Sequence, residues 1–201
     1  MPNIAAAKYI AYELSKQLPD CYFIIIGKVC DAITVPGDAD NVLLFGEIDN
    51  DYKNVLYSIA DIAINPMLGG SGSNLKLAES FSWKLPTITT AFGARGYEIT
   101  NEKQAIICDL DQFAESVRRL QSSKELAKAI ALNAFEYVKE NIEWTVLGKK
   151  YRNLIDKQVY GMQRKKLLII SYRLTLPALG GAETYLYELL KRLDKQDDFD
   201  I

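Results

Sequence analysis

The sequence predicts an α/β fold: a Rossmann-like parallel sheet with helices on both faces, closed by C-terminal helices. Short apolar segments of strand length alternate with amphipathic helical segments up to residue 121, and this alternation is typical of β-α-β crossover units. The apolar segments do not alternate between apolar and polar residues, which indicates strands buried on both faces of the sheet. After residue 122 the pattern is purely helical.

The individual elements follow from the apolar spacing and from the flanking residues. Residues 4–18 place their apolar side chains on one helical face, with Asn3 as the cap and Pro19 as the stop. Strands are expected at residues 22–27, 42–46, 62–64, 87–90 and 105–108, and helices between them at residues 50–59, 73–83 and 111–121.

The C-terminal part of the chain is expected to hold two closing helices and then the start of another domain. Ser122 and Glu125 predict a capping box for the first helix. A second apolar stripe begins at Trp144, which we interpret as a core anchor. We place the boundary near residue 160. Residues 1–160 then form one domain, and residues 161–201 form a linker and the first β-loop-α unit of a following domain, too small to close a core alone.

Composition excludes several classes of function. A net charge of -2 with scattered basic residues provides no surface for nucleic acid or an anionic membrane. No apolar run approaches the ~20 residues that span a bilayer, and the N-terminal residues lack the basic region of a signal peptide. The absence of histidine rules out His-based triads and most zinc sites. Three cysteines without C-x-x-C spacing favour reduced thiols in a cytoplasmic protein.

The stretch GGSGSNLKLAES, residues 69–80, is the main candidate for a ligand site. It joins a predicted strand to a helix that starts near Asn74, and ligands collect at the carboxyl ends of parallel strands. The unpaired N–H groups and the dipole of such a helix N-terminus attract phosphate, whereas the same composition also suits a plain flexible loop. The stretch fails G-x-G-x-x-G, because Leu75 stands at its last position, and it lacks G-x-x-x-x-G-K-[ST].

Glu79 favours the phosphate interpretation. It lies in the second turn of the predicted helix, where a carboxylate is placed to accept hydrogen bonds from a ribose. The alternative is a surface pair with Lys76, three residues earlier, worth only ~0.3 kcal/mol.

Three D-x-D pairs mimic a motif that holds a divalent metal: Asp38 and Asp40, Asp49 and Asp51, and Asp109 and Asp111. Only the third pair follows a predicted strand, and there Asp109 or Asp111 is more simply a helix cap. Two carboxylates without further ligands make a poor metal site. We therefore expect no metal and no cofactor.

Several motifs in order carry a family resemblance. The run SGSNLKLAESF at residues 71–81, followed by KLPTITT at 84–90 and FGARGY at 92–97, resembles the donor-binding half of a GT-B glycosyltransferase. It is most similar to the large retaining family four, and the resemblance covers roughly residues 2–158. It implies transfer of a sugar from a nucleoside diphosphate sugar to an acceptor hydroxyl, as in carbohydrate biosynthesis.

The resemblance also implies a donor site. Glu79 stands where the family has the acid that contacts the ribose, and Ser71 stands where it has an acid that helps to hold the donor sugar. Backbone amides around Asn74 would meet the diphosphate, and the bend at residues 46–48 would lie near the base. The implied donor-binding residues are Gly70, Ser71, Gly72, Ser73, Asn74, Leu75, Lys76 and Glu79, with weaker support for Gly46, Glu47 and Ile48. No catalytic residue is assigned.

Parts of the family's active site are missing from this chain. A strand precedes the first helix in the family, and the loop after it supplies an Arg and a Lys to the diphosphate. The acceptor-binding domain, with its catalytic-site histidine, is also missing, so we expect the fragment alone to be inactive. Acceptor glycan or lipid would bind through that domain, and the full-length protein would be cytoplasmic and membrane-peripheral. Residues 166–193 resemble the first β-loop-α unit of a GT-B acceptor domain.

The missing strand leaves two buried sheet edges unpaired, because the first strand of a 3-2-1-4-5-6 sheet is central. We hypothesise that Leu167–Ser171, from this or a neighbouring chain, fills the gap by strand exchange or in a homodimer, or that upstream sequence supplies the strand. Direct pairing of residues 24–26 with 62–64 would contradict the first version.

Two other functions are compatible with the same pattern. Ser71 in place of an acid also suits a non-catalytic nucleotide-binding or structural module of a multidomain protein. A GT-B epimerase shares the sheet architecture, but it typically relies on histidine and acidic residues that have no counterpart here.

Overall fold

The structure is a computed structural model of the 201-residue chain. It describes residues 1–35, 37, 39–158, 165–166, 187–191 and 199–200. The chain divides into two compact units, Met1–Glu136 and Tyr137–Ile201, which we describe separately. The domain boundary expected near residue 160 falls among residues 159–164, outside the described residues, and stays a prediction.

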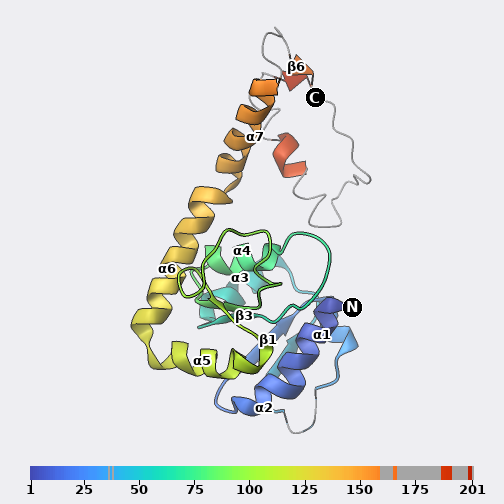
Figure 1. The fold of residues 1–201 in the computed structure, drawn as a ribbon. Helices are drawn as coiled ribbons and strands as arrows, with labels where there is room; N and C mark the ends of the chain where they lie inside the picture. Colours follow the sequence, from blue (N-terminus) through green and yellow to red (C-terminus); the bar gives the residue numbers. More distant parts are fainter. Residues whose placement is uncertain (36, 38, 159–164, 167–186, 192–198, 201) are drawn as a thin grey trace. The chain divides into compact units, whose positions relative to one another are not determined.

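The first unit has the α/β fold that the sequence predicts, with parallel strands and flanking helices (Figure 1). Its N-terminal helical segment is made of α1 (Pro2–Tyr9), a π-helical stretch (Ile10–Leu14) and α2 (Ser15–Gln17). The strands are β1 (Phe23–Ile26), β2 (Val42–Phe45), β3 (Ala63–Asn65), β4 (Thr87–Thr89) and β5 (Ile106–Ile107). The remaining helices are a 3₁₀ turn (Lys28–Ala32), α3 (Asn50–Ile59), α4 (Leu75–Ser82), a 3₁₀ turn (Leu110–Gln112), α5 (Phe113–Ser122) and α6 (Lys124–Asn141), which runs on into the second unit.

The five strands form two separate parallel sheets. In the first sheet β1 pairs with β2, with Phe23 opposite Val42. In the second sheet β4 lies between β3 and β5, with Ala63 opposite Thr87. Among the described residues, no strand joins β1 to β3, so the direct pairing that would contradict strand exchange is not formed. Leu167–Ser171, the segment hypothesised to fill the gap, lies outside the described residues.

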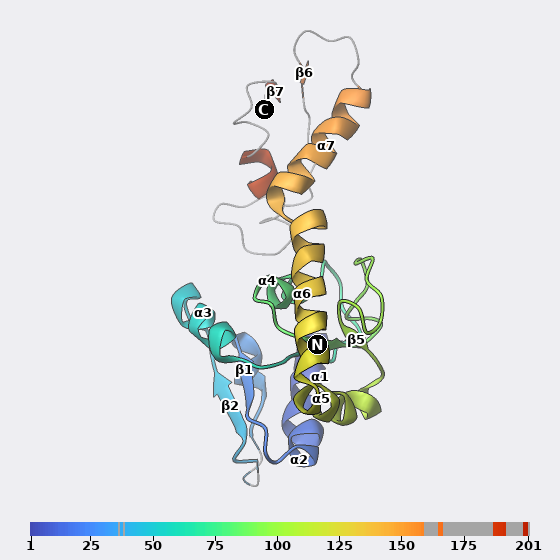
Figure 2. The same cartoon turned by 90° about the vertical axis from the view of Figure 1, so that its left-hand side faces the viewer.

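The core of the first unit is shared by helices and by both sheets. In both views the N-terminal helical segment lies along β1, and α5 lies near the C-terminal end of that helical segment (Figures 1 and 2). Buried side chains from all these elements form one cluster, which includes Ala11, Leu14, Phe23, Ile25, Val42, Ile88, Ile106, Phe113, Val117 and Ile130. The three cysteines are free thiols within this unit.

The structure confirms one of the helix caps that the sequence predicts, at Asp109, and contradicts two. The cap expected at Asn3 is wrong, because α1 begins at Pro2 with Met1 as its flanking residue, and Asn3 lies inside the helix. Asp49 accepts a 2.8 Å hydrogen bond from the Tyr52 amide at the start of α3, and Asp109 forms a capping box with Gln112. The capping box predicted at Ser122 and Glu125 is wrong. Helix α5 continues through Ser122, so the chain turns one residue later, and Ser123 Oγ accepts from the Leu126 amide at 3.2 Å.

Tyr9 connects α1 to the segment that follows β5 through a hydrogen bond and a ring contact. Its hydroxyl donates to the Leu110 carbonyl at 2.5 Å, and its ring meets Phe113 edge-on with centroids 5.9 Å apart. Burial, with a smaller effect of Glu13, raises the pKa of Tyr9 to about 12. The folded chain therefore holds the phenol proton more tightly than the unfolded chain, whose tyrosines titrate near pH ~10.

We expect Tyr9→Phe to lower the free energy of unfolding at neutral pH by about 1 kcal/mol, because it removes one buried hydrogen bond. In the wild type, the contribution of Tyr9 is complete below pH ~10 and is lost as pH rises through about 12. The variant should therefore lose less stability in that window. Urea unfolding at neutral and alkaline pH measures both effects. Tyr52→Phe, at an exposed tyrosine, is the matched control, and an equal alkaline loss in Tyr9→Phe and wild type would contradict the assignment.

The second unit begins inside α6 and contains α7 (Trp144–Gln158). Two short strands, β6 (Lys165–Lys166) and β7 (Phe199–Asp200), pair in parallel, and residues 187–191 are helical. Most of the strand and helix expected between residues 166 and 193 lies outside the described residues.

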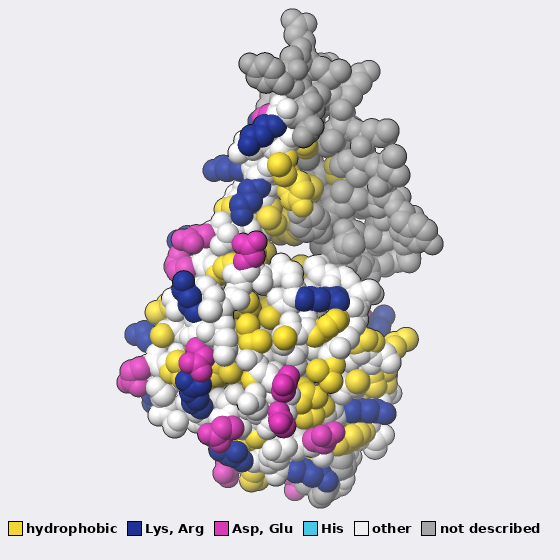
Figure 3. All heavy atoms as spheres, viewed as in Figure 1, with side chains coloured by type: hydrophobic (Ala, Val, Ile, Leu, Met, Phe, Trp, Pro, Cys, Tyr) yellow, Lys and Arg dark blue, Asp and Glu magenta, His cyan; other side chains and the backbone are white. Residues whose placement is uncertain are grey.

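Acidic and basic side chains are mixed on the surface, in keeping with the low net charge of the chain. On the face shown in Figure 3, basic and acidic side chains are interspersed among apolar and neutral groups. Among the residues described, no helix has the length and apolar content needed to cross a bilayer.

Candidate functional site

The glycine-rich loop, residues 69–74, leads from the end of β3 to the start of α4. Gly70 and Gly72 have φ angles of 129° and 93°, a region that side chains strongly disfavour, so the turn requires glycine at both positions. Ser71 and Ser73 are exposed on this loop. The loop therefore presents backbone and small polar groups at the carboxyl end of β3, where ligands collect in α/β sheets.

A polar network behind the loop holds it in place. Asn74 Nδ2 donates to the Gly93 carbonyl at 2.9 Å, and the Tyr97 hydroxyl donates to the Asn74 carbonyl at 2.7 Å. Asn65 Nδ2 donates to Thr89 Oγ1 at 3.2 Å and to the same Gly93 carbonyl at 3.4 Å. Residues 92–97 thus support the loop from behind. The sequence drew attention to them only as part of a resemblance, because their contacts are long-range.

No side chain caps the N-terminus of α4. The side chain of Asn74, the residue before the helix, makes no capping bond, because it donates to the Gly93 carbonyl instead. The first turn of α4 has no acidic residue. The Leu75 amide donates to the Ser73 carbonyl at 2.9 Å and the Leu77 amide donates to the Asn74 carbonyl at 3.0 Å, so neither is free for a ligand. The dipole of an uncapped helix start attracts negative charge.

Two basic side chains flank this helix start. Lys76 Nζ donates to Asn3 Oδ1 at 3.0 Å, and although part of the side chain is open to solvent, desolvation lowers the pKa of its ammonium. Arg95 Nη2 donates to the Gly72 carbonyl at 3.0 Å, with its guanidinium 4.1 Å from the Phe92 ring centroid. The sequence did not single out Arg95 as a site residue. Its position just beyond β4, on the same sheet edge as the loop, was the available signal.

A cavity of about 370 Å³ lies over the loop and brings most of the predicted donor-binding residues together. Its lining includes Met67, Gly69, Gly70, Ser71, Ser73, Asn74, Leu75, Lys76 and Arg95. Gly72 and Glu79 do not line it. The cavity shares Asn3, Met67 and Lys76 with a larger cavity of about 1250 Å³.

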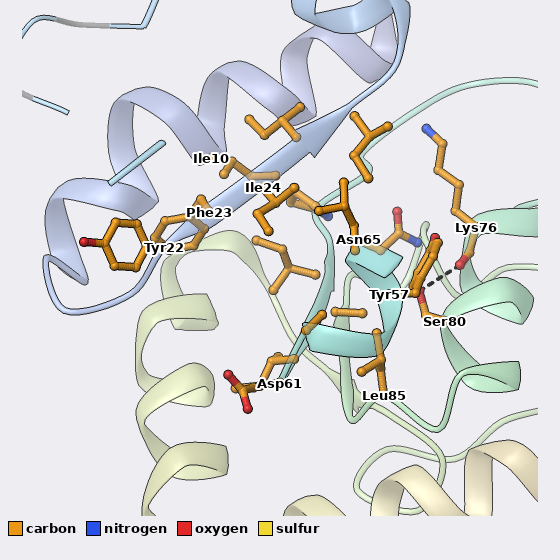
Figure 4. A pocket seen from close by; sticks show the side chains of 18 of the residues that line it. Ile10, Tyr22, Phe23, Ile24, Tyr57, Asp61, Asn65, Lys76, Ser80 and Leu85 are labelled. Atoms are coloured by element: carbon orange, nitrogen blue, oxygen red, sulfur yellow. Dashed lines mark hydrogen bonds between the residues drawn. The ribbon is translucent and has the colours of Figure 1, made fainter. Parts of the chain in front are cut away.

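Glu79 lies on the larger cavity and already has two partners from α3. Its Oε1 is 2.6 Å from Lys53 Nζ, and its Oε2 accepts from the Tyr57 hydroxyl at 3.4 Å. The pair with Lys76 that the sequence left open is therefore replaced by a pair with Lys53. Burial first, and then the charge of Glu79, raise the pKa of Tyr57 to about 12. Tyr57 also stacks on Trp83 with ring centroids 5.8 Å apart, and Figure 4 shows Tyr57 beside Lys76 and Ser80.

The bend after β2 also lies on the larger cavity. Glu47 and Ile48 line the cavity, and Glu47 pairs with Lys28 at 3.3 Å on an exposed surface. Gly46 does not line it, and its carbonyl accepts from the Gly27 amide at 3.0 Å. The bend and Glu79 thus lie along one cavity.

The D-x-D pairs do not gather with other ligating groups. Asp49 and Asp109 cap helices, and Asp38 lies outside the described residues. Within the described part of the chain, no three His, Cys, Asp or Glu side chains lie close enough together to hold a metal ion. That donor binding needs no metal stays a prediction.

The fold and the loop place the chain in a class of proteins. Parallel strands covered by helices, with the glycine-rich loop at the carboxyl end of a strand, form the C-terminal domain of GT-B glycosyltransferases, which match this structure. The family model described as "Glycosyl transferases group 1" matches residues 3–123. The chain belongs to this family of transferases.

Individual relatives are more distant and longer. The chain is 27% identical over 131 residues to an "Uncharacterized 44.6 kDa protein in cps region" of Klebsiella pneumoniae, an alignment that covers 65% of this chain and 31% of that protein. A glycosyltransferase from Rickettsia africae superposes with a TM-score of 0.64 at 19% identity, over 78% of this chain and 46% of that one. Anabaena Alr3699/HepE, solved with UDP-glucose, superposes with a TM-score of 0.56 at 14% identity, over 70% of this chain and 43% of that one. The structural matches show the fold alone, and the chain spans less than half of each relative.

Proposed function

We propose that this chain is the donor-binding part of a retaining glycosyltransferase and that it binds a nucleoside diphosphate sugar at the glycine-rich loop. The uncapped start of α4 carries the proposal, because Lys76 and Arg95 flank it over one cavity. An anion at this position meets the positive end of the helix dipole and two cations. A diphosphate fits these groups better than a neutral ligand does.

The nucleoside would extend from the small cavity into the larger one. Lys76 lines both cavities, and Glu79 lies beyond it, one helical turn further along α4. To accept hydrogen bonds from a ribose, the Glu79 carboxylate would exchange its contact with Lys53 or Tyr57 for the ribose hydroxyls. The bend at Glu47 and Ile48, which lines the same cavity, would face the base.

In the whole protein, the proposed reaction transfers the sugar from the diphosphate to an acceptor hydroxyl with retained configuration. The bond between the anomeric carbon and the diphosphate breaks, and a bond to the acceptor oxygen forms. Positive groups at the loop stabilise the charge that develops on the departing diphosphate, which lowers the barrier without a metal. The acceptor, a glycan or lipid, and a cytoplasmic, membrane-peripheral location belong to the same proposal, as does inactivity of this chain alone.

Titration calorimetry of the 201-residue chain with UDP and UDP-glucose tests donor binding. UDP-glucose is the first sugar to try because the Anabaena neighbour was solved with it. We expect saturable binding, unchanged by a chelator, and Arg95→Ala should weaken it about 10-fold, because a hydrogen bond to a charged group contributes roughly 1.5–3 kcal/mol. Arg118→Ala, at an exposed arginine of α5, is the matched control. No binding of UDP, GDP or their sugars would contradict the proposal.

A non-catalytic nucleotide-binding module is the second candidate. Ser71 favours it, because this side chain lines the small cavity where the family resemblance implies an acid for the donor sugar. Both candidates bind the nucleotide, so only turnover separates them. Transfer or hydrolysis of UDP-glucose by the full-length protein would support the enzyme, and binding without turnover would support the module.

A further inference from the structure

The carboxyl ends of β1 and β2 form one edge of the larger cavity. The two strands pair in parallel, with Ile26 opposite Phe45, so their carboxyl ends lie side by side (Figure 2). Residues 26–29 and 47–48, at or just beyond these ends, line the cavity of about 1250 Å³. Because ligands of α/β sheets bind at the carboxyl ends of the strands, side chains at this edge are placed to contact a ligand.

Backbone contacts hold the two strand ends together. The Gly27 amide donates to the Phe45 carbonyl at 2.9 Å and lies 3.0 Å from the Gly46 carbonyl oxygen. Cys30 Sγ, from the turn that follows β1, lies 3.3 Å from the same Phe45 oxygen. The residues that come directly after these contacts, Lys28 and Glu47, therefore start from fixed backbone positions.

Lys28 and Glu47 are the charged side chains that these two strand ends bring to the cavity. Lys28 Nζ lies 3.3 Å from Glu47 Oε1, and the two side chains are 76% and 69% exposed. An ion pair this exposed contributes little to the stability of a protein. A ligand can therefore replace the contact between Lys28 and Glu47 at small cost.

Apolar side chains lie next to this pair. Val29 and Ile48 are half-buried, line the same cavity and follow Lys28 and Glu47 directly in the sequence. Binding pockets typically combine an apolar lining with a few polar groups that fix the orientation of the ligand. The apolar side chains suit the faces of a nucleotide base, and the charged pair suits its hydrogen-bonding edge.

The charged pair presents one donor group beside two acceptors. The Lys28 ammonium only donates hydrogen bonds, whereas the Glu47 carboxylate only accepts them, through two oxygens. Guanine has the complementary edge, because its O6 accepts and its adjacent N1–H and N2–H groups both donate. It is the only common base with two neighbouring donors on this edge. Uracil has a single donor, N3–H, between two carbonyl oxygens, so it leaves one carboxylate oxygen unpaired.

We propose that Lys28 and Glu47 select guanine, so that the donor of this chain is a guanosine diphosphate sugar. The inference rests on the proposed function, which places the ribose at Glu79 and the base near Glu47. The Glu47 oxygens accept from N1–H and N2–H of guanine, and Lys28 donates to O6. A base that leaves a charged oxygen unpaired binds more weakly, because that oxygen has lost its water without gaining a donor.

Titration calorimetry of the 201-residue chain with GDP, IDP and UDP tests the proposal. These ligands share the ribose and the diphosphate, and the base of IDP is guanine without its N2 amino group. We expect GDP to bind about 10- to 100-fold more tightly than UDP, because hydrogen bonds to charged groups are the stronger ones. IDP should bind roughly 10-fold more weakly than GDP, because one Glu47 oxygen loses its donor.

The outcomes separate this inference from the proposed function. Binding of UDP, ADP or CDP as tight as that of GDP would overturn the inference and leave the nucleotide site in place. Equal binding of IDP and GDP would also contradict it, because Glu47 would then not accept from the N2 amino group. If no nucleoside diphosphate binds, both the inference and the proposed function are wrong.

A substitution of Glu47 gives a test that a loss of structure cannot imitate. Glutamine presents one acceptor and one donor, which match N1–H and O2 of xanthine in place of N1–H and N2–H of guanine. Glu47→Gln should therefore reverse the order and bind xanthosine diphosphate about 10-fold more tightly than GDP. Glu115→Gln, at an exposed glutamate of α5, is the matched control and should keep the order of the wild type. An unchanged order in Glu47→Gln would refute the proposal.

A substitution of Lys28 distinguishes base recognition from a purely structural role of the ion pair. Lys28→Met should weaken GDP binding about 10-fold, because O6 loses its donor. It should keep the preference for GDP over IDP, because Glu47 still accepts from the N2 amino group. If the pair only holds the ends of β1 and β2 together, Lys28→Met and Glu47→Gln will weaken the binding of GDP, IDP and UDP equally, and the proposal fails.

Discussion

Replacing Glu79 with glutamine should weaken the binding of UDP to this chain by roughly 10- to 100-fold. Hydrogen bonds to a charged group contribute about 1.5–3 kcal/mol, and each ~1.4 kcal/mol corresponds to a factor of ten in Kd. Glutamine keeps the size of the side chain but accepts weaker hydrogen bonds from the ribose. Titration calorimetry with UDP measures the change, and Glu115→Gln on α5, at an exposed glutamate, is the matched control.

The contact between Glu79 and Lys53 makes a second variant informative. If Glu79 acts only by holding α3 against α4, Lys53→Met should impair UDP binding as much as Glu79→Gln, because either change removes the 2.6 Å ion pair. If Glu79 binds the ribose, Lys53→Met frees the carboxylate, and UDP should bind as tightly as in the wild type or more tightly. UDP binding by Glu79→Gln within twofold of the wild type would remove the ribose assignment.

The strands of the first unit were predictable because each is a short apolar run. Burial on both faces is confirmed for β4, but it is wrong for β1 and β2, where Ile24, Leu43 and Phe45 are exposed. Ile24 to Ile26 and Leu43 to Leu44 are apolar without alternation, and each lies in a parallel strand. Local chemistry also placed α4, because glycines with positive φ precede it and its apolar spacing is helical. The capping error at Ser122 has the opposite cause: Ser122 and Ser123 suit a cap equally well, and only the length of α5 decides between them.

The parts of the candidate site that escaped prediction depend on contacts across the chain. The partner of Glu79 is Lys53, from a different helix, so the choice between a ribose-facing carboxylate and a Lys76 pair could not be made from spacing. Arg95 reaches Gly72 across 23 positions, and only the fold places β4 beside β3 so that this contact can form. The break between β1 and β3, in contrast, agrees with the sheet order that the sequence predicts, and what fills it stays a prediction.

Gly93 is where the network behind the loop is most tightly packed, and Gly93→Ala should therefore destabilise the chain by about 2–4 kcal/mol. Its φ angle is not in the left-handed region, so space alone makes glycine necessary. An added Cβ would lie 2.7 Å from Asn65 Nδ2 and 3.0 Å from the Asn65 carbonyl, and it would overlap Thr89 Oγ1. The Asn65 carbonyl is backbone on β3 and cannot move away cheaply. Thermal unfolding should show a fall of roughly 10 °C in the melting temperature.

A glycine-to-alanine substitution at Gly148 should have the opposite effect on the stability of the chain. No atom lies within 4 Å of a Cβ at Gly148, inside α7, so Gly148→Ala should stabilise the chain by roughly 0.5–1 kcal/mol through helix propensity. A second substitution tests the contacts of Gly93. Thr89→Ala removes the worst overlap of a Cβ at Gly93 but leaves the clash with the Asn65 carbonyl. The Gly93→Ala/Thr89→Ala double variant should therefore recover part, and not all, of the stability that Gly93→Ala loses. A Gly93→Ala chain as stable as the wild type would show that residues 92–97 are not a rigid support, and the loop would then lack the fixed geometry that diphosphate binding requires.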